Sequence, residues 1–201
     1  MKVVIIKYNA GNIRSVLFAL ERLKIEAVVS DDHHVIKGAD KVIFPGVGEA
    51  STAMSYLKER GLDKTIVSLK QPVLGICLGM QLLCDYSEEN DTTCMGVFKG
   101  KVKKFGSSIR PGGAGGPKVP QIGWNNIYGL KSPLFNGVKE NAYMYFVHGY
   151  YAETGSNTVS STDYITSYSS ALQKDNFFAL QFHPEKSGDE GQLVLHNFLQ
   201  Q

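Results

Sequence analysis

The sequence has little of what builds a disulfide framework or a zinc site. Its 201 residues include three cysteines, Cys77, Cys84 and Cys94, and no two of them form a Cys-x-x-Cys pair. An odd number of isolated cysteines argues against both kinds of site, so we expect no metal. Unpaired thiols are typical of a reducing compartment, which favours a cytoplasmic location.

Strong charge bias and long apolar runs are also missing. The net charge is +2, and Lys and Arg are scattered, so we expect no nucleic acid as a partner. The apolar run Val3 to Ile6 ends at Lys7, which is too short for a signal peptide or a membrane span. We therefore expect no membrane partner.

What is present indicates an α/β fold in which residues 1–201 form one domain. The first half alternates strand and helix patterns, with strands at 3–6, 25–30, 41–44 and 72–76 and helices at 12–24, 50–60 and 62–70. In the second half turns separate strands at 97–105, 125–128, 142–148, 158–161, 170–173 and 177–182, before a helix at 190–199. We expect a mainly parallel, partly mixed central sheet flanked by helices.

One stretch, residues 106–120, is low in complexity and contains five residues in a row that are glycine or alanine, at 112–116. No strand leads into it and no helix follows it. The pattern therefore predicts a mobile surface loop rather than a phosphate-binding loop.

The sharpest local signal is an apolar strand that turns abruptly into a helix at Gly75-x-Cys77-x-Gly79. This is the thiol form of a nucleophile elbow, in which the glycines fit a crowded turn. The helix N-terminus favours a thiolate, and the N–H of Leu78 faces the developing oxyanion. A buried structural cysteine is the simpler alternative, and it is our interpretation for Cys84 and Cys94.

A thiol nucleophile needs a general base, and the base needs a group that holds its tautomer. His183 ends the apolar strand 177–182, and Pro184 then directs the chain so that Glu185 can reach the imidazole. A capped strand end would explain His183 in isolation, but beside the elbow the catalytic interpretation is favoured. His148 also ends a strand, where a pocket role and a packing role are equally compatible with the sequence.

A second glycine loop, Pro45-Gly46-Val47-Gly48, follows another strand. In a parallel sheet it opens at the same edge as Cys77, so its N–H groups, at Gly46 or Val47, would complete an oxyanion hole. The spacing fits neither a dinucleotide-binding loop nor a Walker motif, so no cofactor is expected.

The elbow at 75–81 together with Gln181-Phe182-His183-Pro184-Glu185 resembles the class I (triad) glutamine amidotransferases. The resemblance implies a flavodoxin-like glutaminase with Cys77 as nucleophile, His183 as acid and base and Glu185 as its orienter. It implies that L-glutamine is held by Gln81, Glu89 and the Gly46–Gly48 loop, and we add His148 to the expected substrate pocket.

Further stretches are similar to one branch of that family, the ammonia-producing subunits of histidine biosynthesis. They include Gly11-Asn12-Ile13-Arg14-Ser15, Gly123-Trp124-Asn125 and Tyr145-Phe146-Val147-His148. The resemblance implies a heterodimer with a (β/α)8-barrel cyclase subunit that receives the ammonia. Candidate interface residues are Trp124, Asn125, Tyr143 and Lys186, although Trp124 fits a core anchor equally well.

The chain departs from that branch at Gln121, where histidine is usual, at Gly149, where serine is usual, and in its glycine-rich loop. Three other functions remain open: a paralogous glutaminase subunit that feeds a different synthase, a cysteine peptidase or other amide hydrolase, and a regulatory module that kept the fold. Ammonia release from free glutamine and the identity of the co-purifying synthase would separate them.

Overall fold

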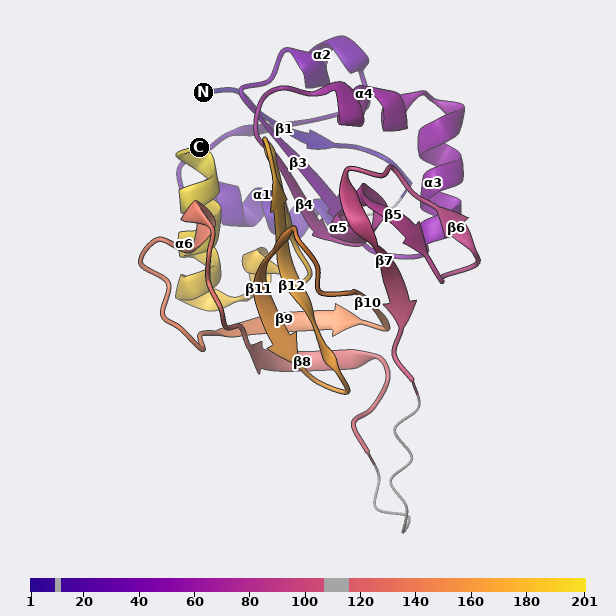
Figure 1. Cartoon of the computed structure of the whole chain (residues 1–201). Coiled ribbons are helices and arrows are strands. Elements are labelled where there is room, and N and C mark those ends of the chain that lie inside the picture. Colours follow the sequence, from indigo (N-terminus) through magenta and orange to yellow (C-terminus); the bar gives the residue numbers. More distant parts are fainter. Residues whose placement is uncertain (10–11, 107–115) are drawn as a thin grey trace.

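A seven-stranded sheet forms the centre of the chain, for which the computed structural model describes residues 1–9, 12–106 and 116–201 (Figure 1). The strand order is β11-β12-β13-β4-β3-β1-β2. The strands are β1 (Val3–Ile6), β2 (Ala27–Ser30), β3 (Lys41–Gly46), β4 (Val73–Cys77), β11 (Thr158–Asp163), β12 (Ser167–Lys174) and β13 (Phe177–Leu180).

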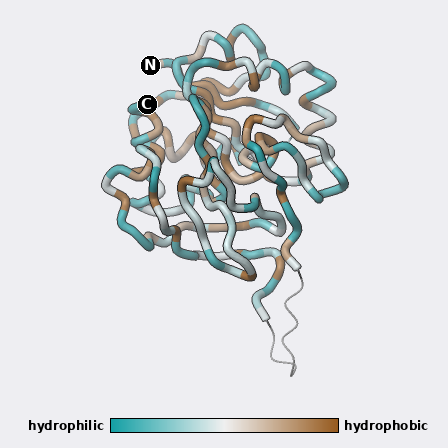
Figure 2. Tube along the Cα trace, viewed as in Figure 1, coloured by the Kyte–Doolittle hydropathy of each residue, from teal (hydrophilic) through white to brown (hydrophobic). Residues whose placement is uncertain are grey.

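The sheet is parallel from β2 to β13 and antiparallel from β13 to β11. Every residue of β1, β3 and β4 is buried, as expected for parallel strands covered on both faces. Figure 2 shows these strands as the hydrophobic interior of the molecule. The prediction of a mainly parallel, partly mixed sheet is confirmed.

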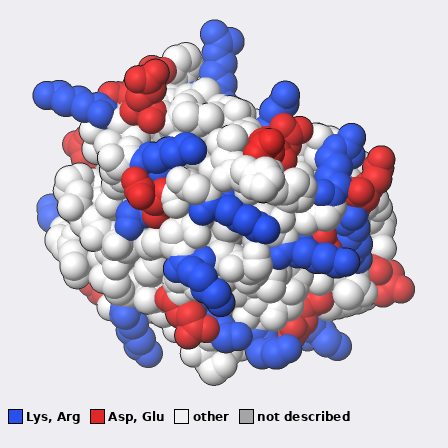
Figure 3. Space-filling model, turned by 90° about the horizontal axis from the view of Figure 1, so that it is seen from above, with Lys and Arg blue, Asp and Glu red and all other residues white. Residues whose placement is uncertain are grey.

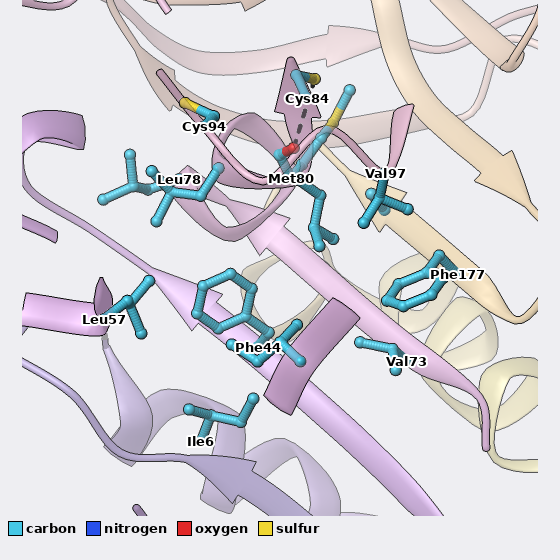
Figure 4. Packing of buried hydrophobic residues seen from close by; sticks show 14 of the residues in the cluster. Ile6, Phe44, Leu57, Val73, Leu78, Met80, Cys84, Cys94, Val97 and Phe177 are labelled. Carbon is cyan, nitrogen blue, oxygen red and sulfur yellow. Dashed lines mark hydrogen bonds between the residues drawn. The ribbon is translucent and has the colours of Figure 1, made fainter. Parts of the chain in front are cut away.

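Two helical layers cover the sheet, and the alternation of side chains along β1 assigns each residue to one of them. Val4 and Ile6 pack with α3 (Ala50–Glu59), α4 (Leu62–Ser68) and α5 (Leu78–Leu83), a cluster shown in part in Figure 4. Val3 and Ile5 pack on the other face with α1 (Ile13–Arg22) and α6 (Gly188–Leu199). The carboxyl ends of the parallel strands lie between these two layers.

Two smaller sheets lie beside the central one. The first has the order β10-β7-β5-β6, formed by β5 (Cys84–Ser87), β6 (Thr92–Thr93), β7 (Phe98–Lys104) and β10 (Tyr150–Ala152). The second is an antiparallel ribbon of β8 (Gln121–Asn126) and β9 (Tyr143–His148). The short helix α2 (His33–Lys37) and the 3-10 turns η1 (Pro133–Phe135) and η2 (Pro184–Lys186) complete the described elements.

Some boundaries differ from the sequence-based expectations. The strand expected at 125–128 begins at Gln121, because β8 pairs with β9 along its whole length, from Gln121 opposite His148 to Asn126 opposite Tyr143. The elements β5, β6, β10 and α2 were not expected, because two to five residues are too few to show a periodic pattern. Most of the glycine-rich loop expected at 106–120 lies outside the described residues.

The face of the molecule seen in Figure 3 carries charges of both signs. Figure 3 shows Lys and Arg interspersed with Asp and Glu over one face, in keeping with the net charge of +2. Within residues 1–9, 12–106 and 116–201, no helix is long and apolar enough to cross a membrane. The same described ranges contain no group of three or more His, Cys, Asp or Glu side chains suited to hold a metal ion.

Candidate active site

The carboxyl ends of three adjacent strands bring the candidate residues together. Gly46 ends β3 and lies opposite Cys77, which ends β4. Strand β13 runs parallel to β4 on its other side and leads to His183. Because parallel strands end at the same edge, residues far apart in the sequence meet there.

Cys77 occupies a strained turn between β4 and α5. Its backbone has φ 53° and ψ −109°, a conformation that L-residues rarely adopt and that costs on the order of 1–3 kcal/mol. A Cβ atom on Gly79 would overlap the carbonyl group of Phe44, and one on Gly75 would lie 3.1 Å from the carbonyl of Gly79. The crowding predicted for this turn is therefore present: it leaves room only for glycine at position 79 and makes a side chain at position 75 a tight fit.

His183 and Glu185 form a buried pair. The His183 Nδ1 and Glu185 Oε1 atoms lie 2.8 Å apart, and the two side chains are 4% and 1% exposed. Burial by itself lowers the pKa of His183, but its hydrogen bonds to Cys77 and Glu185 and their negative charges outweigh burial and raise that pKa above its ordinary value. With Nδ1 held by the carboxylate, Nε2 is left to exchange a proton with the thiol.

The sulfur of Cys77 has two further polar neighbours that the sequence analysis did not identify. The Val147 carbonyl oxygen and Gln181 Nε2 each lie 3.7 Å from Sγ. Gln181 stands two residues before His183, and this spacing is the one sequence signal that points to it. Tyr8 was also missed: its hydroxyl donates at 2.8 Å to the carbonyl of Pro45, the first residue of the glycine loop.

A cavity of about 260 Å³ opens beside the cysteine. Its wall contains these residues proposed from the sequence: Val47, Gly48, Cys77, Leu78, Gln81, Glu89, His148, His183 and Lys186. Gly46 is buried and does not line the cavity, and neither do Trp124, Asn125 and Tyr143. Lys186, which we expected at a partner interface, thus also faces the cavity.

Three polar side chains of this wall have defined partners. Glu89 Oε2 accepts the Ala50 N–H at 2.7 Å, at the start of α3, and burial raises the pKa of Glu89 above its ordinary value. Gln81 Nε2 donates to the Tyr150 carbonyl at 2.9 Å. Burial lowers the pKa of His148 to about 4, so this imidazole is neutral near pH 7.

The other two cysteines lie away from the cavity, in the apolar cluster of Figure 4. The Cys84 thiol donates to the Met80 carbonyl at 3.6 Å, and burial raises the pKa of Cys84 far above that of a free thiol. Burial also raises the pKa of Cys94 to about 12. Neither thiol can form the thiolate that nucleophilic catalysis needs near neutral pH.

Comparison with known proteins agrees with the resemblance to the class I glutamine amidotransferases. The family model for glutamine amidotransferase class-I matches residues 5–201. A Bacteroides fragilis protein named imidazole glycerol phosphate synthase subunit HisH is 56% identical over 200 residues, which cover 100% of both chains. The chain belongs to the HisH family of class-I glutamine amidotransferases.

A more distant relative supports this membership, and a solved structure shares the fold. The HisH subunit from Haemophilus influenzae is 41% identical over 201 residues, covering 100% of this chain and 98% of that one. Among solved structures, PurLQS from Thermotoga maritima superposes with a TM-score of 0.70 at 19% identity, covering 99% of this chain and 97% of that chain. At that identity the likeness concerns the fold alone.

The candidate interface residues of this amidotransferase lie on or near the β8–β9 ribbon. Trp124 and Tyr143 are 55% and 63% exposed, so the interpretation of Trp124 as a core anchor is wrong. The side chain of Asn125 already has a partner in this chain, because its Nδ2 donates to the Asp163 carbonyl at 2.9 Å. Lys186 Nζ lies 5.9 Å from the ring centroid of Tyr145.

Alternation along the ribbon separates an outer from an inner face. The exposed side chains Ile122, Trp124 and Tyr143, with the half-buried Tyr145, define what we call the docking face. Val147 continues this face in register and belongs to the cavity wall. The exposed apolar surface therefore extends from the mouth of the cavity outward.

Proposed function

We propose that this chain hydrolyses L-glutamine to glutamate and ammonia through Cys77, His183 and Glu185. The supporting observation is the buried His183–Glu185 hydrogen bond of 2.8 Å beside a cysteine in a strained elbow at a cavity mouth. Residues 1–201 act as one amidotransferase domain, in line with a family match over residues 5–201. No metal or cofactor is needed for this chemistry.

The reaction proceeds in two halves. The Cys77 thiolate attacks the side-chain amide carbon of glutamine, and the carbonyl oxygen becomes an oxyanion. His183 protonates the leaving nitrogen, so that the C–N bond breaks, ammonia departs and a thioester remains. His183 then takes a proton from water, whose oxygen attacks the thioester; the C–S bond breaks and glutamate is released. Glu185 holds the imidazole in the orientation that both steps require.

Oxyanion stabilisation falls to backbone N–H groups. The N–H of Leu78, the first residue of α5, has no partner within the helix, because the first turn of any helix leaves such donors free. The second donor comes from Gly46, which ends β3 opposite Cys77, or from Val47, which follows it.

The remaining cavity residues suit the charged end of free glutamine. Gln81 uses both amide hydrogens on Tyr150 and Gln181, so toward a substrate it offers its oxygen. Glu89 adds a carboxylate, and both groups fit an α-ammonium. Lys186 provides a positive charge for the α-carboxylate, while Gly48 and the neutral His148 shape the wall.

The ammonia passes to a partner, a (β/α)8 cyclase subunit of imidazole glycerol phosphate synthase in the cytoplasm. There it reacts with a ribulosyl aminoimidazole-carboxamide nucleotide to give imidazole glycerol phosphate and an aminoimidazole-carboxamide ribotide in histidine biosynthesis. Support comes from relatives named HisH that are 41–56% identical over their full length and from the apolar docking face that continues from the cavity. Burial of Ile122, Trp124 and Tyr143 drives the association.

The test is glutamate production by the purified chain, alone and mixed with the cyclase subunit and its nucleotide ligand. We expect a large rise in the mixture and its loss in Cys77→Ala, which still binds the cyclase. Equal activity with and without the cyclase would point to a paralogous subunit of a different synthase. Cleavage of peptides instead of glutamine would point to a peptidase, and absence of all turnover would point to a regulatory module.

A further inference from the structure

The orientation of two buried amides follows from one backbone carbonyl. A carbonyl oxygen only accepts hydrogen bonds, so both side-chain atoms that contact the Tyr150 oxygen must be donors. They are Gln81 Nε2 at 2.9 Å and His148 Nδ1 at 2.7 Å. The Tyr150 carbonyl therefore determines which end of the Gln81 amide is nitrogen, and which ring nitrogen of His148 carries its proton.

This assignment extends to Gln181. The Gln81 nitrogen also lies 2.9 Å from one end of the Gln181 amide, which must then be the oxygen Oε1. The other end, Nε2, is consequently turned toward Cys77 Sγ at 3.7 Å. A chain of hydrogen bonds thus runs from Tyr150 through both glutamines to the sulfur and ends in a donor.

Gln181 acts on the sulfur and not on a substrate. Gln181 is 0% exposed, and it does not line the cavity. Its backbone N–H is bound to the Ser170 carbonyl at 2.9 Å, which fixes the base of the side chain. A substrate in the cavity would therefore contact Cys77 without contacting Gln181.

The two polar neighbours of Sγ affect its two protonation states differently. The Val147 carbonyl, 3.7 Å away, can accept the S–H hydrogen but offers nothing to a thiolate. Gln181 is a neutral donor, and it continues to donate after the proton has left. A hydrogen bond to the charged form stabilises that form.

We propose that Gln181 is a positioning residue that holds the Cys77 sulfur as a thiolate next to His183, and that Gln81 and the Tyr150 carbonyl keep its amide turned to donate. The proposal rests on the proposed function for its consequences in glutamine turnover. Its central claim concerns the reactivity of the thiol, which can be measured without glutamine.

The test is the rate of Cys77 alkylation by iodoacetamide as a function of pH, followed on the Cys77 peptide by mass spectrometry. In Gln181→Met, which removes the donor at similar side-chain length, we expect the pH midpoint of alkylation to rise by about one unit or more. Glutamine turnover in the complex should fall at least about tenfold in kcat, with KM changed less than about threefold.

A second variant and a control separate this role from a general loss of structure. Gln81→Met leaves the Gln181 amide in place but free to turn, and should raise the alkylation midpoint by a smaller amount. Asn176→Leu removes an amide from the opposite end of β13, where Nδ2 donates to the Leu69 and Gln71 carbonyls at 3.0 and 2.8 Å. It should lower thermal stability without moving the midpoint.

The outcomes are distinguishable. An unchanged alkylation midpoint in Gln181→Met overturns the proposal. If Gln181→Met does not fold, an unchanged midpoint in Gln81→Met overturns it. The wild type could fail to hydrolyse glutamine, even with the cyclase, while Gln181→Met still shows a raised alkylation midpoint. That result upholds the role of Gln181 in thiolate formation and overturns the proposed function.

Discussion

His183 Nδ1 lies 2.8 Å from Glu185 Oε1, and only Pro184 separates the two residues in the chain. The second carboxylate oxygen, Oε2, is buried and has no hydrogen-bond partner among the described residues. The imidazole is thus the single described partner of this carboxylate. A hydrogen bond of this kind determines which imidazole nitrogen carries the proton.

Glu185→Gln should lower glutamine turnover without loss of the fold. The amide can present its N–H₂ to Nδ1, which moves the ring proton to Nε2 and prevents that atom from accepting the thiol proton. We expect kcat to fall by about 10²- to 10⁴-fold while KM stays within about threefold. Steady-state kinetics of the complex measures this, and wild-type kcat in the variant would remove Glu185 from the mechanism.

A glutamine-like electrophile, such as a diazoketone analogue of glutamine, should label Cys77 and leave Cys84 and Cys94 unmodified. Burial raises the pKa of both other thiols, that of Cys94 to about 12, so near pH 7 they carry almost no thiolate. Peptide mass spectrometry locates the adduct. Cys94→Ala is the matched control and should be labelled like the wild type, whereas an adduct on Cys84 or Cys94 would contradict the assignment.

Trp124→Ala should weaken binding of the cyclase subunit. Trp124 is 55% exposed, and its ring stands edge-on to that of Tyr145, with ring centroids 5.9 Å apart, in the middle of the docking face. Aromatic anchors of this kind contribute about 2 kcal/mol or more, so the Kd should rise at least about thirtyfold.

Isothermal titration calorimetry with the purified cyclase measures that change. Val67→Ala is the control, because Val67 is 43% exposed on α4, which lies at the other end of the molecule from β8 and β9 in Figure 1. Equal weakening by both substitutions would argue against a specific docking face.

Stability should fall in mild acid because of His148. Its pKa is about 4 in the folded chain and 6.5 when exposed, so below pH 6.5 the unfolded state binds a proton that the folded state does not. Folding stability therefore decreases from about pH 6.5 down to about pH 4, by roughly 3 kcal/mol in all.

Urea unfolding at pH 7 and pH 5 measures this contribution. The wild type should lose about 2 kcal/mol more than His148→Gln between these values, since the variant lacks the titrating group. The groups that face His148, Tyr168 and His183, are retained in both proteins and cancel in the comparison. An identical pH dependence would show that His148 is not held neutral.

Local signals account for much of what could be predicted from the sequence. The elbow at Cys77 and the segment from Gln181 to Glu185 are recognisable because the residues of each motif are neighbours in the sequence. No knowledge of the fold is needed to see them together. Apolar runs located most strands, and the helices at 50–60 and 62–70 were placed to within two residues of α3 and α4. The strand β8 was displaced, because its start depends on pairing with β9 and not on its own residues.

The residue types and their spacing by themselves determined the family, and they led to the proposed nucleophile, its base and the carboxylate beside it. Only the tertiary structure decided that Gln181 points at a sulfur 104 positions away, that the Val147 carbonyl also contacts that sulfur, and that Trp124 is exposed while His148 is neutral. The physical reason is that these properties depend on strand order and register and on the burial they produce, which arise from contacts between distant segments and leave no period in the sequence.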